Sequence, residues 1–339
     1  MASHEVGISA HELRKSYPGG RQALRVQALD GLSIEVEAGT IFGLLGPNGA
    51  GKSTTVKILS TLSRADSGAA EVAGIDVARH PDQVRGVIGF VAQKSVADPM
   101  DTGRENLVLA GRLQGMRGRH ARDRAAELLE RFSLTPAADR LAKTYSGGMA
   151  RKLDVAIGLM NRPQVLFLDE PTTGLDPEAR ADMWSELEAM AKVERMTVLL
   201  TTHYLKVADR LASRLAIVDH GRVVVAGSPE QLKDGLHGDA VIVELAAGED
   251  AAEGLRLLER VPGLDEVLVD GRVLRGRAAS GAEALPRVLA ALDSARLSGA
   301  RLAVASATVA RPSLDDVYLR HTGRSYSAAA AAASEGVRA

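Results

Sequence analysis

The chain of 339 residues contains no cysteine. This absence excludes disulfide bonds, thiolate zinc sites and cysteine nucleophiles, and it is typical of proteins from a reducing compartment. The first thirty residues lack the apolar core of a signal peptide, and no run of about 18 apolar residues occurs anywhere. We therefore expect neither a secretory signal nor a membrane-spanning segment, so any role at a membrane would require a partner.

Net charge is also nearly absent, because 42 Lys and Arg residues face 43 Asp and Glu residues. Such a chain has no global field that would draw it to nucleic acid or to anionic lipid. Its basic run, residues 111–124, lacks interleaved aromatic side chains, so a solvated helical face is the better interpretation. We expect no nucleic-acid partner.

The length and the 45% hydrophobic content predict one large domain and a smaller one. Residues 1–230 alternate buried-strand runs with helices and glycine-rich loops, which predicts an α/β domain with a parallel or mixed sheet covered on both faces. The β signal disappears between Asp101 and Tyr145, which predicts an inserted helical subdomain over about residues 95–160. The strands expected in this domain are Ile41–Leu45, Val87–Ala92, Val165–Leu168, Thr197–Thr202 and Leu215–Asp219.

The smaller domain is expected over residues 231–322. Its pattern gives the order β, α, β, β, α, β, which permits a small α+β split βαβ sandwich. The segment RPSLDDVYLRHTGR follows, in which Ser313 could cap a short helix that carries Asp315 and Asp316. Residues 323–339 include six consecutive alanines and are predicted to form a disordered tail.

The sharpest motif is GPNGAGKS, which fits the phosphate-loop pattern G-x-x-x-x-G-K-[ST] between an expected strand and an expected helix over 54–62. The glycines let backbone N–H groups surround a phosphate, Lys52 neutralises phosphate oxygens, and the Ser53 hydroxyl can ligate Mg²⁺. The motif predicts a nucleoside triphosphate site. Its residues are Gly46, Pro47, Asn48, Gly49, Ala50, Gly51, Lys52, Ser53 and Thr54.

Polar groups follow three other expected strands. Asp169 and Glu170 end VLFLDE, His203 follows TVLLTT, and Gln93 follows VIGFVA. Ligands of open α/β sheets bind at the carboxyl ends of the strands, so these groups should converge on the phosphate loop. Asp169 is placed to hold Mg²⁺, Glu170 to polarise the attacking water, and Gln93 to reach either one. Taken alone, the acidic pair could cap a helix and the histidine could be structural.

The segment TYSGGMARKLD, residues 144–154, predicts a second anion-binding feature. A Gly-Gly pair leads into an amphipathic helix, and the first N–H groups of a helix are unpaired and lie at its positive end. One domain would therefore carry two phosphate-binding helix ends.

The order of Tyr17, GPNGAGKST, Gln93, YSGGM, VLFLDEP, GLDP and His203 resembles the ATP-binding cassette (ABC) ATPases over about residues 5–230. The resemblance implies that Tyr17 stacks on adenine, that Asp176 crosses a dimer interface and that His203 contacts the γ-phosphate. It also implies that two subunits form a homodimer on binding ATP and Mg²⁺. The phosphate loop would hold ATP in its own subunit, and the partner would contribute Ser146, Gly147, Gly148 and Met149.

A finer resemblance extends to about residue 324. TYSGGM with KLD, LLTTHYL, IVDHGRVVVAGSPEQLK and PSLDDVYLRHTGR are similar to segments in the ATPase subunits of daunorubicin-resistance exporters. This implies a chain at the cytoplasmic face of the cell membrane. There it would hydrolyse ATP to energise efflux of a drug or another hydrophobic small molecule through a separately encoded transmembrane permease.

The chain departs from the common family pattern at three positions. Tyr145 replaces a leucine and Met149 a glutamine in the signature, and Lys206 stands where many relatives carry an acidic residue. None of these changes removes a catalytic group, so we expect hydrolysis to be retained.

The alternative class is a soluble ABC-type ATPase that acts on DNA or ribosomes. DNA-acting relatives separate the two phosphate-loop halves by long coiled coils, and this chain has no extended heptad region. Ribosome-associated cassette proteins generally carry two cassettes, whereas this chain has one phosphate loop and one signature.

Overall fold

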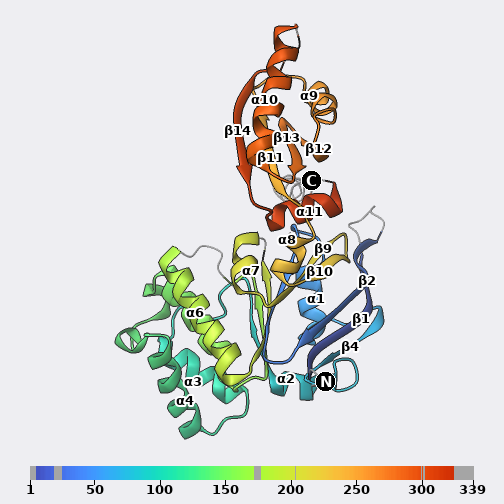
Figure 1. Ribbon diagram of the computed structural model, residues 1–339. Helices are drawn as coiled ribbons and strands as arrows, with labels where there is room; N and C mark the ends of the chain where they lie inside the picture. The colour runs from blue at the N-terminus through green and yellow to red at the C-terminus, as the bar shows by residue number, and fades with distance from the viewer. Residues whose placement is uncertain are drawn as a thin grey trace. The chain divides into compact units, whose positions relative to one another are not determined.

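The computed structural model describes residues 5–18, 25–171, 177–202, 204–298, 300 and 302–323. The chain divides into two compact units, Met1–Ala226 and Gly227–Ala339 (Figure 1). Within the described residues, no helix combines the length and apolarity that are needed to cross a membrane.

A six-stranded sheet in the order β10-β9-β3-β8-β7-β6 forms the centre of the first unit. Its strands β3, β6, β7, β8 and β9 pair in parallel, so their carboxyl ends meet at one edge. Continuous apolar runs are typical of parallel strands buried on both faces, which explains why the sequence predicted these strands correctly. The strands are β3 (Ile41–Leu45), β6 (Ile88–Val91), β7 (Val165–Asp169), β8 (Thr197–Thr202), β9 (Arg214–Asp219) and β10 (Arg222–Gly227).

A second sheet, in the order β2-β1-β4-β5, is antiparallel and was not distinguished in the sequence. Its apolar residues, such as Ile8 and Leu32, share one core with Phe42 of β3. The sheet thus buries one side against the central sheet. Its strands are β1 (Val6–Tyr17), β2 (Val26–Glu37), β4 (Ser67–Val72) and β5 (Ile75–Asp76).

The central sheet separates two apolar cores, and β7 contributes to both because alternate side chains point to opposite faces. Val165 and Phe167 pack in the core shared with the antiparallel sheet and α1. Leu166 and Leu168 pack in the core shared with the helical subdomain and α6. The helices around the sheet are α1 (Lys52–Leu59), α2 (Pro81–Val87), α6 (Pro177–Glu194) and α7 (Leu205–Leu211).

The helical subdomain lies between β6 and β7 in the chain, and Figure 1 shows its helices beside α6. Thr102 and Glu105 form a reciprocal capping box that fixes the start of its first helix. Leu107, Leu128 and Leu153 join its three helices in one buried cluster. These helices are α3 (Gly103–Leu113), α4 (Gly118–Arg131) and α5 (Gly147–Gly158), with short 3₁₀ turns η1 (Thr135–Ala137) and η2 (Ala142–Thr144).

The second unit has the predicted order of elements in an antiparallel sheet, β12-β13-β11-β14. Val241, Val288 and Leu292 belong to the core that joins this sheet to α9 and α10. Ser313 caps the last helix in a capping box with Asp316, as the sequence predicted. The elements are α8 (Pro229–Asp234), β11 (Asp239–Leu245), α9 (Ala251–Leu258), β12 (Asp265–Asp270), β13 (Val273–Ala278), α10 (Gly281–Leu297), β14 (Val304–Ala310) and α11 (Leu314–Thr322).

Candidate active site

The phosphate loop joins β3 to α1 in a turn that requires glycine. A Cβ atom on Gly46 would lie 2.3 Å from the Val218 carbonyl oxygen. A Cβ atom on Gly51, where φ is 111°, would lie 2.7 Å from the Ala28 carbonyl oxygen. The helix therefore begins at Lys52, directly after the loop, rather than at the predicted residue 54. It ends at Leu59 rather than at residue 62, since Thr61 adopts a left-handed φ of 64°.

Lys52 is the cation of this loop and is only 5% exposed. Its Nζ donates hydrogen bonds to the carbonyl oxygens of Gly46 at 2.6 Å and Pro47 at 3.0 Å. Burial lowers the pKa of the Lys52 ammonium, and the carboxylates of Glu170 and Asp169 act in the opposite direction. A positive group held inside a ring of backbone groups is well suited to meet phosphate oxygens.

Asp169 lies at the end of β7, within reach of two hydroxyl groups. Its Oδ1 accepts a hydrogen bond from Ser53 Oγ at 3.1 Å and one from Thr201 Oγ1 at 2.6 Å. A hydroxyl and a carboxylate side by side form the hard-oxygen donor set that suits Mg²⁺. No cluster of three or more His, Asp or Glu side chains in the described part of the chain could hold a metal by itself.

Glu170 follows Asp169 in a left-handed conformation, with a φ of 49°. For a residue other than glycine this conformation costs about 1–3 kcal/mol, so the surroundings must hold it. The Glu170 N–H donates to Thr201 Oγ1 at 3.0 Å, and Gln93 Nε2 donates to Glu170 Oε2 at 3.0 Å. Because a carboxylate only accepts hydrogen bonds, this contact leaves the amide oxygen of Gln93 available to another ligand.

The signature segment begins α5 on the helical subdomain. Ser146 is the N-cap residue, and its Oγ accepts a hydrogen bond from the Met149 N–H at 3.2 Å. Ser146 and Gly147 are exposed, so this helix end is accessible to a ligand. The unusual Tyr145 fits because it lies against Gly103, where a Cβ atom would lie 2.1 Å from the tyrosine oxygen. The Tyr145 hydroxyl donates a hydrogen bond to the Ala137 carbonyl at 2.8 Å.

Tyr17 ends β1, and the residues before it are held in place. Lys15 Nζ lies 5.5 Å from the centroid of the Tyr17 ring. Asp66 accepts hydrogen bonds from Lys15 Nζ at 2.9 Å and from the Ser16 N–H at 2.7 Å. These contacts lower the pKa of Asp66 to about 2, the Lys15 hydrogen bond being the largest cause.

Two predicted site residues, Asp176 and His203, lie outside the described residues, as does the predicted tail beyond Gly323. Thr54 lies in the first turn of α1. Lys206 is exposed in the first turn of α7. Contacts at the carboxyl edge of the sheet join four of the predicted site residues by way of Thr201. They are Ser53, Asp169, Glu170 and Gln93.

The sequence did not point to Thr201 or Arg151. Thr201 lies opposite Asp169 in the β7–β8 register, so its hydroxyl can reach both acidic residues of the pair. Arg151 is 7% exposed, although it follows the exposed signature in the same helix. The signal for Thr201 was available, since it precedes His203 in a strand predicted to lie at this edge.

A strand, a phosphate loop around a buried lysine, and an acidic pair at the end of a parallel strand together define a P-loop nucleotide hydrolase. A family model described as ABC transporter matches residues 29–173. Two solved dimeric ABC cassette structures, one bound to ADP and phosphate, each have a TM-score of 0.60 and 26% identity to this chain. Each match covers 65% of this chain and 98% of the solved chain.

Curated relatives match both units. A daunorubicin resistance ATP-binding protein of Streptomyces coeruleorubidus is 47% identical over 93% of this chain and 95% of its own length. A daunorubicin/doxorubicin resistance ATP-binding protein of Streptomyces peucetius is 44% identical, over 93% and 92%. A doxorubicin resistance ATP-binding protein of Mycobacterium tuberculosis is 41% identical, over 95% of each. The chain therefore belongs to the ABC transporter family, among the nucleotide-binding ATPase subunits of daunorubicin-resistance type, and a role on DNA or ribosomes is not favoured.

Proposed function

We propose that this chain binds ATP with Mg²⁺, hydrolyses it between two copies of itself, and thereby energises efflux of a hydrophobic drug through a separate membrane subunit. The observation that carries the proposal is the chain of contacts from Ser53 through Asp169 and Thr201 to Glu170 and Gln93. These groups lie at one sheet edge beside the loop that holds Lys52. The names of the curated relatives support a drug as the substrate.

The residues gathered at the sheet edge have roles that their positions support. Lys52 binds the β- and γ-phosphates. Ser53, Asp169 and Gln93 would hold Mg²⁺, which neutralises developing negative charge when it is bound. Glu170 orients the attacking water. We assign adenine stacking to Tyr17, the γ-phosphate contact to His203 and the interface contact to Asp176 from the family resemblance alone.

The second phosphate-binding helix end requires a second subunit. The start of α5 is exposed and lies on the helical subdomain, whereas Ser53 and Asp169 lie at the edge of the central sheet. We assign Ser146, Gly147, Gly148 and Met149 to the ATP held by the partner's loop. ATP would then join two subunits, and hydrolysis would release them, which provides the conformational change that transport needs.

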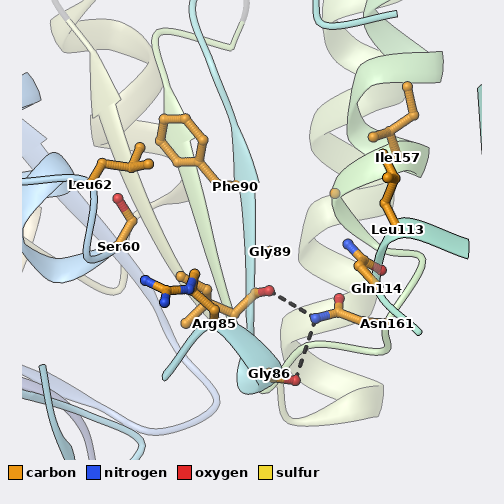
Figure 2. Close-up of a pocket in the computed structure, with 12 residues that line it drawn as sticks. Ser60, Leu62, Arg85, Gly86, Gly89, Phe90, Leu113, Gln114, Ile157 and Asn161 are labelled. Atoms are coloured by element: carbon orange, nitrogen blue, oxygen red, sulfur yellow. Dashed lines mark hydrogen bonds between the residues drawn. The ribbon is translucent and has the colours of Figure 1, made fainter. Parts of the chain in front are cut away.

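A groove in the first unit is suited to the membrane subunit. It has a volume of about 550 Å³ and lies between β6 and the helical subdomain (Figure 2). Leu62, 62% exposed, and Leu113, 79% exposed, line it together with Phe90. Phe90 lies three residues before Gln93, so a segment bound here could influence the hydrolytic site. Docking at this groove would place the chain at the cytoplasmic face of the membrane.

Glu170→Gln tests the nucleotide part of the proposal. The amide cannot act as a base but keeps nearly the same shape, so the variant should bind ATP, lose turnover and accumulate as an ATP-dependent dimer. Size-exclusion chromatography with light scattering, in ATP and Mg²⁺, measures this directly. Adding Ser146→Arg to the same variant should restore the monomer without loss of ATP binding. A monomer at every ATP concentration for Glu170→Gln alone would contradict the two-subunit site.

The same substitution tests transport. Wild-type chain, expressed with its membrane subunit in a drug-sensitive host, should lower the accumulation of a fluorescent anthracycline, and Glu170→Gln should abolish this effect. Efflux that is unchanged by Glu170→Gln would show that ATP hydrolysis by this chain does not drive it.

A further inference from the structure

Arg151 makes an unusual set of contacts for a buried arginine. It lies in the second turn of α5, is 7% exposed, and donates hydrogen bonds to backbone carbonyl oxygens of two other segments. One contact, at 2.6 Å, is with Ala92, directly before Gln93. The others are with Pro171 at 2.6 Å and Asp169 at 3.5 Å, on either side of Glu170.

Asp154, one turn further along α5, completes the arrangement. It is 2% exposed and lies 3.6 Å from the Arg151 guanidinium. Its Oδ1 accepts hydrogen bonds from Ser95 Oγ at 2.8 Å and from the Val96 N–H at 3.1 Å. The two side chains therefore hold the backbone on both sides of Gln93 and on both sides of Glu170.

Stability alone does not account for this pair. A buried ion pair costs several kcal/mol of desolvation per ion, and a well-packed apolar pair of similar volume is often as stable. The ion pair adds a fixed orientation, because a planar guanidinium can donate hydrogen bonds to several carbonyl oxygens in defined directions. The carbonyl groups that it meets belong to the two segments that carry Gln93 and Glu170, whose side chains are themselves hydrogen-bonded.

We propose that Arg151 and Asp154 are positioning residues that couple the signature end of α5 to the hydrolytic pair Gln93 and Glu170 in the same subunit. Since the signature end would contact ATP held by the partner, each subunit's hydrolytic pair is adjusted by ATP in the other subunit's loop. This inference rests on the roles proposed for Gln93, Glu170 and the signature. It assigns to Arg151 neither ATP binding nor contact with the reacting atoms.

Arg151→Met tests the coupling. Because the phosphate loop is untouched, ATP affinity should stay within about threefold of wild type, measured by nucleotide binding in the Glu170→Gln background. Turnover should fall roughly tenfold or more, since small misplacements of catalytic groups have effects of that size. Under this proposal, hydrolysis by the wild-type chain should be positively cooperative in ATP, and in Arg151→Met this cooperativity should disappear because the two sites no longer influence each other.

Arg124→Met is the matched control. Arg124 is also 7% exposed, and it donates a hydrogen bond to the Leu159 carbonyl at the C-terminal end of α5, at 2.8 Å. Among the described residues, no hydrogen bond joins it to the segments around Gln93 and Glu170. Its loss should lower the melting temperature while turnover per folded molecule and cooperativity stay within about twofold of wild type. Arg151→Lys keeps the positive charge but lacks the several planar N–H donors of the guanidinium, so its turnover should lie between those of Arg151→Met and wild type.

The proposal is overturned if Arg151→Met keeps turnover and cooperativity like Arg124→Met, or if its turnover falls only in proportion to lost ATP binding. Should Arg151→Met fail to fold, Asp154→Asn is measured in its place, because it keeps the shape and removes the charge; unchanged turnover and cooperativity would then overturn the proposal. Failure of the proposed function appears differently, as wild-type turnover in Glu170→Gln.

Discussion

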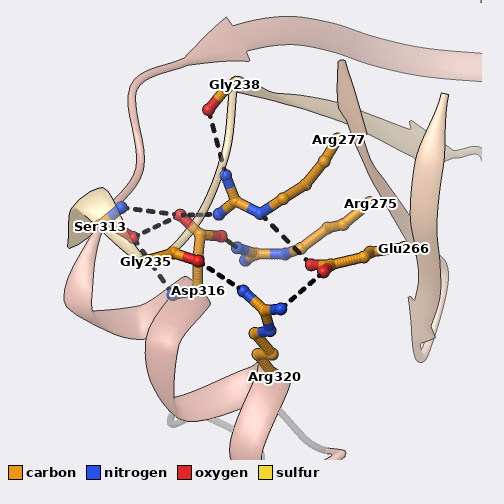
Figure 3. Close-up of polar contacts among 8 residues, drawn as sticks. All are labelled: Gly235, Gly238, Glu266, Arg275, Arg277, Ser313, Asp316 and Arg320. Atoms are coloured by element: carbon orange, nitrogen blue, oxygen red, sulfur yellow. Dashed lines mark hydrogen bonds and ion pairs between the residues drawn. The ribbon is translucent and has the colours of Figure 1, made fainter. Parts of the chain in front are cut away.

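In the first unit, the buried ammonium of Lys52 is bound to two carbonyl oxygens of its own loop, and both can be exchanged for phosphate oxygens. In the second unit, the carboxylate of Asp316 meets Arg275 at 3.1 Å and Arg277 at 3.9 Å (Figure 3). Asp316 and Arg277 are each 8% exposed. The charges of this cluster thus neutralise one another, whereas the charge of Lys52 lies in the phosphate loop.

This difference indicates which buried charges to interpret as functional. A charge held by replaceable neutral partners can bind a ligand without breaking the fold. The charge of Asp316 is held by opposite charges and serves structure, because it fixes α11 to β13. Arg320 extends the same network, because it donates to the Gly235 carbonyl at 2.7 Å and pairs with Glu266 at 3.0 Å. We therefore expect substitutions in the two units to damage different properties.

Lys52→Ala should have the largest effect. Removing the ammonium leaves the phosphates without their buried cation, so ATP affinity should fall by about two orders of magnitude or more, while the unit stays folded. Nucleotide binding measured by calorimetry checks this. Lys57→Ala, on the exposed face of α1, is the control and should bind ATP normally. Normal ATP binding by Lys52→Ala would refute the assignment of the phosphate loop.

Asp316→Ala should have the next largest effect, on stability rather than on ATP. It removes the carboxylate that Arg275 and Arg277 share, while Arg275 keeps its pair with Asp315 and Arg277 its pair with Glu266. The second unit should therefore lose about 3 kcal/mol, the lower end of the cost of breaking a buried ion pair. The single tryptophan, Trp184, lies in α6 of the first unit. Circular dichroism should therefore show an early unfolding transition that tryptophan fluorescence does not follow, and ATP binding should persist.

Asp293→Ala is the control for that experiment, because Asp293 forms an exposed pair with Arg296 in the same unit. It should leave the transition unchanged. If both signals report the same unfolding transition in Asp316→Ala, the two units unfold as one. Asp316 would then not stabilise the second unit separately from the first.

Asp66→Asn should have the smallest effect. Since the folded pKa of Asp66, about 2, lies below its ordinary value of 3.8, its contribution to stability is present above pH 3.8 and is lost as the pH falls toward 2. The stability difference from wild type, measured by urea unfolding, should shrink over that window. Near neutral pH, looser support of Tyr17 should raise the KM for ATP by roughly two- to fivefold. A stability difference from wild type that does not change with pH would show that the charge of Asp66 does not stabilise the fold.

The sequence predicted well wherever one local pattern carried the information. The buried strands of the central sheet are continuous apolar runs, and each was found close to its predicted bounds. The antiparallel sheet was not predicted, because its strands β1 and β2 mix buried and exposed residues and are interrupted by register shifts. Its role in covering one face of the central sheet depends on contacts between distant segments.

The candidate site divides in the same way. The residue types at GPNGAGKS, DE and SGGM were sufficient to predict a phosphate loop, an acidic pair and a second anion-binding helix end, since each motif is a local requirement of backbone geometry or charge. No motif pointed to the Arg151–Asp154 pair, and Thr201 was missed although its place near the end of a predicted strand could have indicated it. The importance of these residues lies in the groups that they meet across the fold. The carbonyl groups that Arg151 meets lie 59 residues before it, at Ala92, and 20 residues after it, at Pro171.

By itself, the sequence determined that the chain is a P-loop nucleotide hydrolase and predicted a second anion-binding helix end, because both conclusions depend on short runs of residues. Only the tertiary structure decided how the signature helix is connected to the hydrolytic pair. Parallel pairing brings Asp169 and Thr201 side by side, and packing of α5 against both loops buries Arg151 where it can reach them. Such contacts follow from the fold of the whole unit, since no short segment contains both partners.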